Sequence, residues 1–491
     1  MRQYQREKNK VLVIGLDCAS PELIFEKWLD ELPHLRSLLQ TGVHGRLQSC
    51  DPPITIPAWA AMMSSRCPGS LGIYGFRNRT NRSYDQLKIA SSRDVKVDRV
   101  WDILSKAGKQ VIVMGVPLTY PVNPVNGIMI SDFLTPDIRS EYTYPHELRD
   151  EIAEVVGEYV LDVRDFRTGK KTKILEDIYE MTRKRFKLIR HFILHKEWDF
   201  LMAVEMGTDR IHHAFWSYMD AAHRNYEAGH SFEHVIREYY QFVDAEIGRV
   251  LELLDKDTTV LIVSDHGAKR MDGGICLNDW LIREGYLHLK TPPDGITPFS
   301  KANIDWTRTV AWGDGGYYGR IFINLKGREP GGIVLAADHE RLLCELKEKI
   351  EQIPDDQGRP MGTKVYRPVD LYPRVENVAP DLFVYFGNLH WRSIGTVGNP
   401  AIHTFENDTG PDDANHGQQG MFIAAPSPGV SLDVMRGEEL IGASLLDIAP
   451  TILEILGHSV PADMEGRSLC IRAEEAVAAS VSCSYEVGVY Q

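Results

Sequence analysis

Short runs of hydrophobic residues recur along the chain, and each run is apolar throughout instead of alternating with polar positions. The runs cover residues 11–16, 110–116, 199–206, 259–264 and 420–425. A continuous apolar run is the pattern of a parallel β-strand that is covered on both faces of its sheet. We therefore predict a set of buried parallel strands.

Amphipathic stretches separate many of these runs and predict helices. The segments LPHLRSLLQTG (32–42) and RVWDILSKAGK (99–109) each place a glycine where a helix would end, and residues 174–195 form a longer amphipathic pattern. Alternating strands and helices predict an α/β fold, a three-layer sandwich with a mostly parallel central sheet and helices on both faces.

The alternation breaks after residue 275, where an aromatic and glycine-rich stretch (311–332) and an isolated helical pattern (338–353) follow. We predict that this part forms an inserted cap or side lobe. The predicted units are residues 8–275 with 376–472 as one discontinuous main domain, 276–375 as the inserted lobe, and 473–491 as a C-terminal tail.

Composition and charge narrow the class of protein. The chain has 491 residues and a formal net charge of −14. Nucleic-acid polymers and anionic membranes bind basic surfaces, so we expect neither as a partner. The seven cysteines are scattered and odd in number, and the first apolar stretch ends after a few residues at Asp17. These features predict a cytoplasmic protein without a disulfide framework.

Three of the predicted strands run directly into carboxylates, which are Asp17, Asp209 and Asp265. The carboxyl ends of parallel strands meet at one edge of an α/β sheet, where ligands bind. Each aspartate alone is typical of a turn or a helix cap. Three carboxylates at one edge repel one another unless cations neutralise them, so together they predict a metal site.

Histidines complete two sets of ligands. In a helix that Asp209 opens, His213 at i+4 lies on the same face, whereas His212 at i+3 is a competitor that the sequence does not exclude. His416 lies just ahead of the run 420–425. A lone histidine in a loop is usually just exposed, so His416 is a candidate ligand only in combination with the other residues. The sets are Asp17, Asp265 and His266, and Asp209, His213 and His416. Aspartate and histidine without thiolate suit two Zn²⁺ ions, although Mn²⁺ and Fe²⁺ accept similar donors.

Thr55 joins the first set. In PPITIPAWAAMM (52–63), Pro57 is tolerated in the first turn of a helix, so Thr55 lies at or just outside a helix N-terminus. For an isolated threonine the usual role there is a helix cap. Beside a metal pair, however, its hydroxyl is a candidate nucleophile for in-line displacement at phosphorus.

The order of these motifs resembles the alkaline phosphatase superfamily, and in particular its type I phosphodiesterase/nucleotide pyrophosphatase branch. The matching motifs are Asp17, TIPAW with Thr55, DRIHH with Asp209 and His213, SDHG with Asp265 and His266, and His416. Residues 445–469 resemble the segment that closes the catalytic domain in many members. The resemblance implies an alkaline-phosphatase-like catalytic domain, two divalent metal ions, and hydrolysis through a phosphothreonine at Thr55.

One departure from this branch bears on the substrate. Its members carry HGI and, three positions after the Ile, an Asn that holds a phosphoryl oxygen. This chain has LGIYGFRNR (71–79), with Leu71 in place of the His and Phe76 in place of the Asn. Asn78 is the candidate replacement.

Charge at the predicted centre favours a diester substrate. Two Zn²⁺ ions balance three aspartates and a threonine alkoxide, and a neutral centre suits a singly charged diester. A monoester dianion requires an additional cation. Arg77, Arg79 and Arg82 are candidates for that cation, and they are equally typical of solvated surface charges.

We therefore predict a metal-dependent hydrolase of small phosphoric esters, a phosphodiesterase/nucleotide pyrophosphatase-like enzyme. A phosphomonoesterase or phosphomutase on the same site is the alternative, and a non-catalytic, metal-stabilised binding protein is the rival from another class. A sulfatase is disfavoured because the nucleophile segment lacks a Cys-x-Pro-x-Arg arrangement. The oligomeric state stays open, as does a substrate contact by Trp312, Tyr317 or Tyr318.

Overall fold

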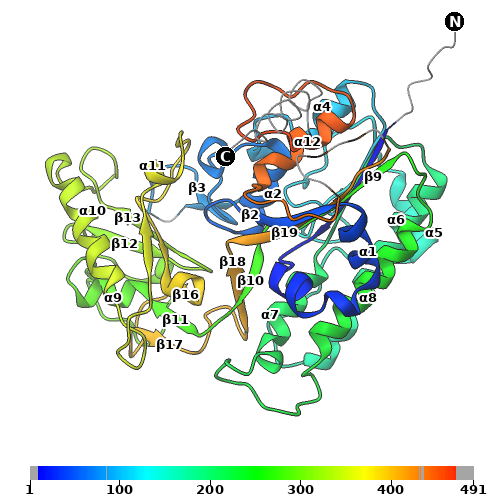
Figure 1. The fold of residues 1–491 in the computed structure, drawn as a ribbon. Coiled ribbons are helices and arrows are strands. Elements are labelled where there is room, and N and C mark those ends of the chain that lie inside the picture. The colour runs from blue at the N-terminus through cyan, green and yellow to red at the C-terminus, as the bar shows by residue number, and fades with distance from the viewer. Residues whose placement is uncertain (1–8, 85, 429, 431, 433–435, 471–491) are drawn as a thin grey trace, which may run out of the picture.

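Two lobes make up the described molecule, and an eight-stranded sheet runs through the larger one (Figure 1). The computed structural model describes residues 9–84, 86–428, 430, 432 and 436–470, so the predicted tail at 473–491 lies outside the described residues. The large sheet contains β1 (Lys10–Leu16), β2 (Val43–Gln48), β5 (Val111–Met114), β6 (Gly127–Ile130), β7 (Thr143–Tyr144), β8 (Phe200–Glu205), β9 (Thr258–Val263) and β19 (Gln419–Ala425). Their order across the sheet is β2-β19-β9-β1-β8-β5-β6-β7.

The middle of this sheet is parallel and buried. Strands β9, β1, β8, β5 and β6 lie side by side in this order and pair in parallel with one another. Every residue of β8 and β9 is buried. Strands covered on both faces need apolar side chains on both faces, which explains the continuous apolar runs in the sequence.

The predicted direction of the strand at 420–425 is wrong. β19 pairs antiparallel with both of its neighbours, β2 and β9. A continuous apolar run indicates burial on both faces, which β19 has, but it contains no information on strand direction. Since Phe422 pairs with Val263, the chain enters β19 at the edge of the sheet where β9 ends.

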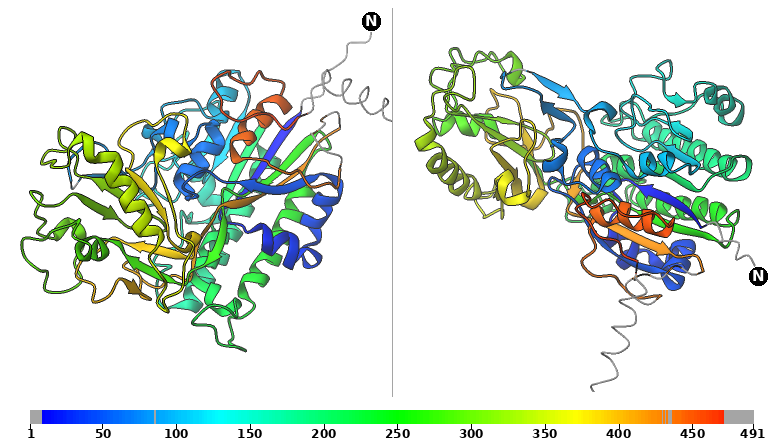
Figure 2. Two further views of the ribbon diagram at one scale, coloured as in Figure 1. Left: turned by 60° about the vertical axis from the view of Figure 1, so that its left-hand side comes forward. Right: turned by 90° about the horizontal axis from the view of Figure 1, so that it is seen from above.

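Helices cover both faces of the large sheet and confirm the predicted three-layer α/β fold (Figures 1 and 2). One layer contains α1 (Pro33–Thr41), α5 (Leu148–Val156), α6 (Lys171–His195), α7 (Gly207–Met219) and α8 (Val235–Leu251). The other contains α2 (Thr55–Ser64), the short α3 (Pro68–Leu71), α4 (Val100–Lys106) and α12 (Ile448–Ile455). Within the described part of the chain, no helix has the length and apolar character needed to span a membrane.

The smaller lobe has sheets of its own (Figure 2). It also has a separate hydrophobic core. Its four-stranded sheet contains β12 (Ala311–Asp314), β13 (Gly319–Ile323), β14 (Lys364–Tyr366) and β15 (Leu382–Tyr385), and its three-stranded sheet contains β11 (Gly273–Cys276), β16 (Trp391–Ile394) and β17 (His403–Thr404). The helices are α9 (Leu277–Arg283), α10 (Ala336–Glu351) and α11 (Pro368–Leu371). The core of the lobe runs from Ile275 to Val397. The unit boundaries at 276 and 375 stay a prediction.

Two small ribbons lie where the lobes meet. The first pairs β10 (Gly267–Arg270) with β18 (Ala414–Gly417), and Figure 1 shows it between the lobes. The second is a hairpin of β3 (Arg77–Arg79) and β4 (Leu87–Ile89). Because both ribbons connect to strands or helices of the large lobe, they place side chains from several elements around one shared space.

Gly420 lies where β19 passes close to the end of β9, and a side chain has no space there. A Cβ at this position would lie 2.2 Å from the carbonyl oxygen of Ser264. We expect Gly420→Ala to lower the free energy of unfolding by about 1–3 kcal/mol, because backbone must move to accept the methyl group. Chemical denaturation measures the change. Gly169→Ala is the control, since a Cβ at Gly169 meets nothing within 4 Å; equal stability of both variants would contradict the expectation.

Candidate active site

The topology of the large lobe brings the predicted metal ligands to one edge of its sheet. Asp17 directly follows β1, Asp209 lies in the first turn of α7 behind β8, and Asp265 and His266 follow β9. His416 lies in β18, just ahead of β19. Because β19 is antiparallel, its start lies beside the end of β9, and His416 therefore reaches the same edge as the aspartates.

The first group of side chains consists of Asp17, Asp265 and His266. One potential ligand atom from each lies within 4.8 Å of those of the other two. His266 Nε2 is 3.2 Å from Asp265 Oδ2 and 3.9 Å from Asp17 Oδ1. The hydroxyl oxygen of Thr55 lies 3.3 Å from the same nitrogen. All four residues are buried, so the first predicted set meets at one buried point.

The second group consists of Asp209, His213 and His416. His213 Nε2 lies 3.1 Å from Asp209 Oδ1 and 3.2 Å from His416 Nε2. His416 Nε2 lies 3.7 Å from the same aspartate oxygen. The rings of His416 and His266 stack with centroids 3.9 Å apart, so the two groups are direct neighbours.

The hydrogen bonds of the three histidines leave their Nε2 atoms free to accept a metal. His266 Nδ1 lies 3.1 Å from the carbonyl oxygen of Gly267, and His416 Nδ1 lies 3.1 Å from that of Pro53. His213 Nδ1 lies 2.6 Å from Asp412 Oδ1. When Nε2 is deprotonated, each ring donates from Nδ1 to this oxygen and directs the lone pair of Nε2 into the cluster.

His212 does not join either group. Its Nε2 lies 3.1 Å from the hydroxyl oxygen of Tyr240, on another side of α7. His213, one residue further along the helix, lies on the face of Asp209, as the i+4 spacing predicts.

Each of the three aspartates has one oxygen with a partner and one without. The partners are the indole N–H of Trp59 for Asp17, the guanidinium of Arg210 for Asp209 and the backbone N–H of Cys18 for Asp265. The other oxygens, Asp17 Oδ1, Asp209 Oδ1 and Asp265 Oδ2, are buried and have no hydrogen-bond partner. Buried polar atoms are rarely left unpaired in proteins. The same three oxygens lie against the histidine Nε2 atoms, so the residues present fit a pair of divalent cations.

The pKa shifts separate Asp17 and Asp265 from Asp209. Burial and the neighbouring Asp209 raise the pKa of Asp17 well above its usual value, and burial and Asp17 do the same for Asp265. Burial raises the pKa of Asp209 as well, but His213 and Arg210 outweigh it and hold that pKa well below the usual value. Burial lowers the pKa of His266 to about 4. Bound cations would remove this repulsion.

Thr55 is the first residue of α2 and does not act as its cap. Ile54 occupies the N-cap position, and no side-chain hydrogen bond caps this helix. The Thr55 hydroxyl instead faces His266 Nε2. Its position at the helix start places it near unpaired backbone N–H groups and the positive end of the helix dipole.

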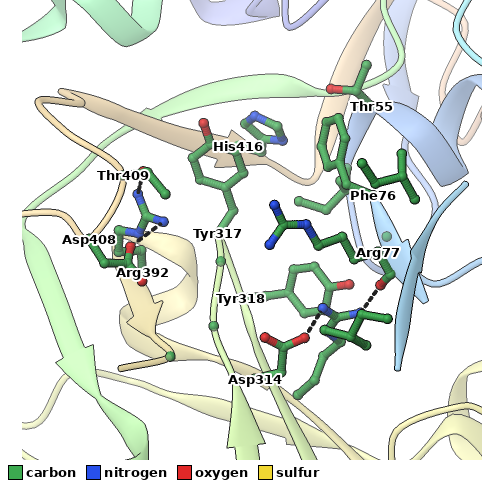
Figure 3. A pocket seen from close by; sticks show the side chains of 18 of the residues that line it. Thr55, Phe76, Arg77, Asp314, Tyr317, Tyr318, Arg392, Asp408, Thr409 and His416 are labelled. Atoms are coloured by element: carbon green, nitrogen blue, oxygen red, sulfur yellow. Dashed lines mark hydrogen bonds and ion pairs between the residues drawn. The ribbon is translucent and has the colours of Figure 1, made fainter. Parts of the chain in front are cut away.

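A pocket of about 620 Å³ opens beside this cluster, between the two lobes (Figure 3). Thr55, Asp209, His213 and His416 form part of its wall. The hairpin β3–β4 and the glycine-rich segment of the smaller lobe line other parts of it. A ligand in this pocket therefore contacts both lobes.

Of the two predicted substrate-binding residues, Arg77 lines this pocket and Asn78 does not. Arg77 and Phe76 line it, whereas Asn78 is not among the described lining residues. The Asn78 amide is engaged by its own turn, since it accepts from the N–H of Tyr74 and donates to the carbonyl of Gly75. Asn78 holds the turn in shape, and only Arg77 reaches the space where a substrate would lie.

Tyr317 is the aromatic residue of the smaller lobe that approaches the ligands. Its ring stacks on His416 with centroids 4.3 Å apart and on His213 with centroids 5.0 Å apart. Tyr318 instead donates its hydroxyl to the carbonyl of Tyr74, and Trp312 packs on Phe322. The aromatic and glycine-rich stretch thus serves both the packing of the lobe and the cover of the site.

Asp412, the residue that orients His213, was not predicted from the sequence. Its second oxygen, Oδ2, lies 3.0 Å from Arg167 Nε and 3.2 Å from the Tyr317 hydroxyl. Asp412 lies in an irregular segment four residues before His416, where neither a strand end nor a helical spacing marks it. The available signal was the acidic pair ahead of the histidine in PDDANH.

Comparison with known proteins gives one family and one fold. The family model described as type I phosphodiesterase / nucleotide pyrophosphatase matches residues 11–417. Human ectonucleotide pyrophosphatase/phosphodiesterase 5 is 13% identical with a TM-score of 0.55, over 94% of this chain and 100% of that one. Phosphonoacetate hydrolase from Sinorhizobium meliloti 1021, solved with phosphonoformate, is 13% identical with a TM-score of 0.60, over 92% of this chain and 96% of that one.

A third similar structure is an inactive variant of the murine ectonucleotide pyrophosphatase/phosphodiesterase 5, with a threonine replaced by alanine, in complex with AMP. It is 12% identical with a TM-score of 0.53, and covers 92% of this chain and 96% of that one. Among curated proteins, no sequence matches the chain. The structural likenesses show an alkaline-phosphatase-like fold.

We expect Asp412→Asn to weaken metal binding about 10–100-fold, because the carboxylate orients His213 and raises the basicity of its Nε2. Competition with a chromophoric chelator measures the affinity, and elemental analysis measures the metal content. Asp413→Asn is the matched control, since the Asp413 side chain accepts from Ser217 instead. Equal metal affinity in both variants would contradict the expected role of Asp412.

Proposed function

The chain belongs to the type I phosphodiesterase / nucleotide pyrophosphatase family, and we propose that it is a two-metal phosphodiesterase with Thr55 as its nucleophile. The family and the structural neighbours support a phosphoester hydrolase. The observation that carries the finer proposal is the convergence of three unpaired carboxylate oxygens and three histidine Nε2 atoms beside the Thr55 hydroxyl.

The two groups of side chains would each hold one divalent cation. Asp17, Asp265 and His266, with Thr55, form one set, and Asp209, His213 and His416 form the other. We propose Zn²⁺ for both positions, because the donors are imidazole nitrogens and carboxylate oxygens. When bound, such ions supply positive charge that activates a nucleophile and stabilises the developing charge on the phosphoryl and leaving oxygens.

Thr55 would carry the phosphoryl group between two displacement steps. Its hydroxyl loses its proton as Oγ1 attacks phosphorus, the bond to the ester oxygen breaks, and that oxygen takes up a proton and leaves as the alcohol. Water then hydrolyses the phosphothreonine and restores the hydroxyl. The start of α2 suits both steps, because the free N–H groups and the helix dipole stabilise negative charge at this point. The inactive threonine-to-alanine form of the murine relative is in keeping with this role.

The pocket supports a small-molecule ester as the substrate. Its volume of about 620 Å³ is in the range of sites for small ligands. Aromatic side chains such as Phe76, Phe166 and Tyr317 offer apolar contacts for the organic part of an ester. A substrate reaches the site through this pocket. The charge and shape of the pocket therefore determine whether a diester or a monoester is accepted.

We expect Thr55→Ala to lower turnover at least about 1,000-fold, because the nucleophile is lost. The metal content is expected to stay near two ions per chain. Hydrolysis of bis-p-nitrophenyl phosphate and of p-nitrophenyl phosphate by the metal-reconstituted protein measures the effect. A preference for the first substrate supports a phosphodiesterase. A preference for the second would replace it by a phosphomonoesterase or phosphomutase.

Two further variants make the Thr55 test specific. Thr55→Ser keeps a hydroxyl and is expected to retain measurable turnover. Thr259→Ala removes an equally buried threonine near the start of β9, away from the end of the strand that carries Asp265, and is expected to leave turnover intact. Full activity of Thr55→Ala would return Thr55 to a structural role and overturn the proposed mechanism.

We expect metal removal to lower both activity and thermal stability, because the three buried carboxylates then repel one another without compensation. Dialysis against a chelator followed by calorimetry measures the melting temperature, and addition of Zn²⁺ is expected to restore it together with turnover. An unchanged melting temperature after complete metal removal would contradict the assignment of these residues as ligands.

A further inference from the structure

Six arginines line the pocket, and five of them are already paired with carboxylates of the protein. Arg79 lies 3.3 Å from Glu329, Arg167 lies 3.0 Å from Asp412 and Arg392 lies 3.1 Å from Asp408. Arg210 pairs with Asp162 and Asp209, and Arg320 pairs with Asp314. The sixth, Arg77, has neither a hydrogen bond nor an ion pair through its guanidinium among the described residues.

The described carboxylates in the pocket wall are also all engaged in ion pairs. The described acidic residues in its wall are Asp162, Asp209, Asp314 and Asp408, and each one pairs with an arginine named above. The charge of Arg77 is therefore the uncompensated one in this part of the pocket. Arg77 is exposed to solvent, so the lack of a partner would be ordinary for it on an open surface. Its place in the wall of a pocket whose other described charges are paired is what marks a position for an anion of the ligand.

Arg77 is held so that its side chain extends into the pocket. It is the first residue of β3, and its carbonyl accepts a hydrogen bond from Arg320. Figure 3 shows the guanidinium reaching from this strand towards the side of the pocket that holds Tyr317 and His416. The backbone is thus fixed by the smaller lobe, while the charged end stays free to bind.

The neighbours of Arg77 do not compete for this role. Phe76 lies against Phe133, with ring centroids 6.1 Å apart, and the Asn78 amide is used within its own turn. Arg82, on the same hairpin, faces Glu329 at 3.8 Å and does not line the pocket. Of the three arginines that the sequence offers as an additional cation, Arg77 alone is unpaired.

We propose that Arg77 is a specificity-determining residue, and that the substrate bears a second anionic group in addition to the phosphoryl group that Thr55 attacks. The proposal rests on the proposed function for the position of the attacked phosphorus. A guanidinium binds a carboxylate or a phosphate through two parallel hydrogen bonds, so either group satisfies the site. A neutral ester substituent leaves the charge of Arg77 unused.

Binding of three non-hydrolysable anions to the metal-reconstituted wild-type protein tests this proposal without turnover. Methylphosphonate has one anionic group, phosphonoformate adds a carboxylate, and imidodiphosphate adds a second phosphate. By titration calorimetry we expect one or both of the latter to bind at least about tenfold more tightly than methylphosphonate. The larger gain identifies the second group as a carboxylate or a phosphate.

Variants then assign the gain to Arg77. We expect Arg77→Ala to abolish it, Arg77→Lys to keep part of it, and Arg82→Ala to leave it intact, because Glu329 also pairs with Arg79 and Arg328. A gain absent from the wild type, or unchanged in Arg77→Ala, would overturn the proposal. The proposed function fails separately, through absent turnover of both nitrophenyl substrates, so the two failures are distinguishable.

Discussion

The mutual repulsion of three buried carboxylates is the constraint on which the rest of the site depends. Asp17, Asp209 and Asp265 are each held by one oxygen, and the partner differs every time: an indole, a guanidinium and a backbone amide. Their remaining oxygens lie together, away from solvent and without protein partners. A fold keeps such an arrangement only if something outside the chain compensates it, and the nitrogen lone pairs of the histidines define where that compensation enters.

Much of this arrangement follows from the sequence because it follows from strand ends. An aspartate that follows a buried parallel strand has a fixed location at the edge of the sheet. The strand pattern alone was therefore enough to place Asp17 and Asp265. Helical periodicity distinguishes His213 from His212 once Asp209 is placed. His416 was assigned together with a strand of the wrong direction; a parallel strand would have put it at the opposite edge, and the antiparallel β19 is what brings it to the ligands.

The site residues that were not predicted from the sequence lie in segments without the periodic pattern of a helix or a strand. Asp412 and Tyr317 lie in irregular segments, and they meet only because the smaller lobe folds back over the ribbon of β10 and β18. Which arginine stays unpaired depends on the location of Glu329 in the folded lobe, more than 200 residues after the hairpin. Such long-range pairings are set by tertiary structure, and local sequence carries no record of them.

The position of β19 has a consequence for how the protein is made. During synthesis Asp17 and Thr55 leave the ribosome early, whereas His416 and β19 follow after the whole smaller lobe. Until β19 inserts between β2 and β9, both of those strands present an unpaired edge and one ligand group lacks a member. Assembly of the centre is therefore a late event, and a truncated chain that ends in the smaller lobe has no complete site to fill.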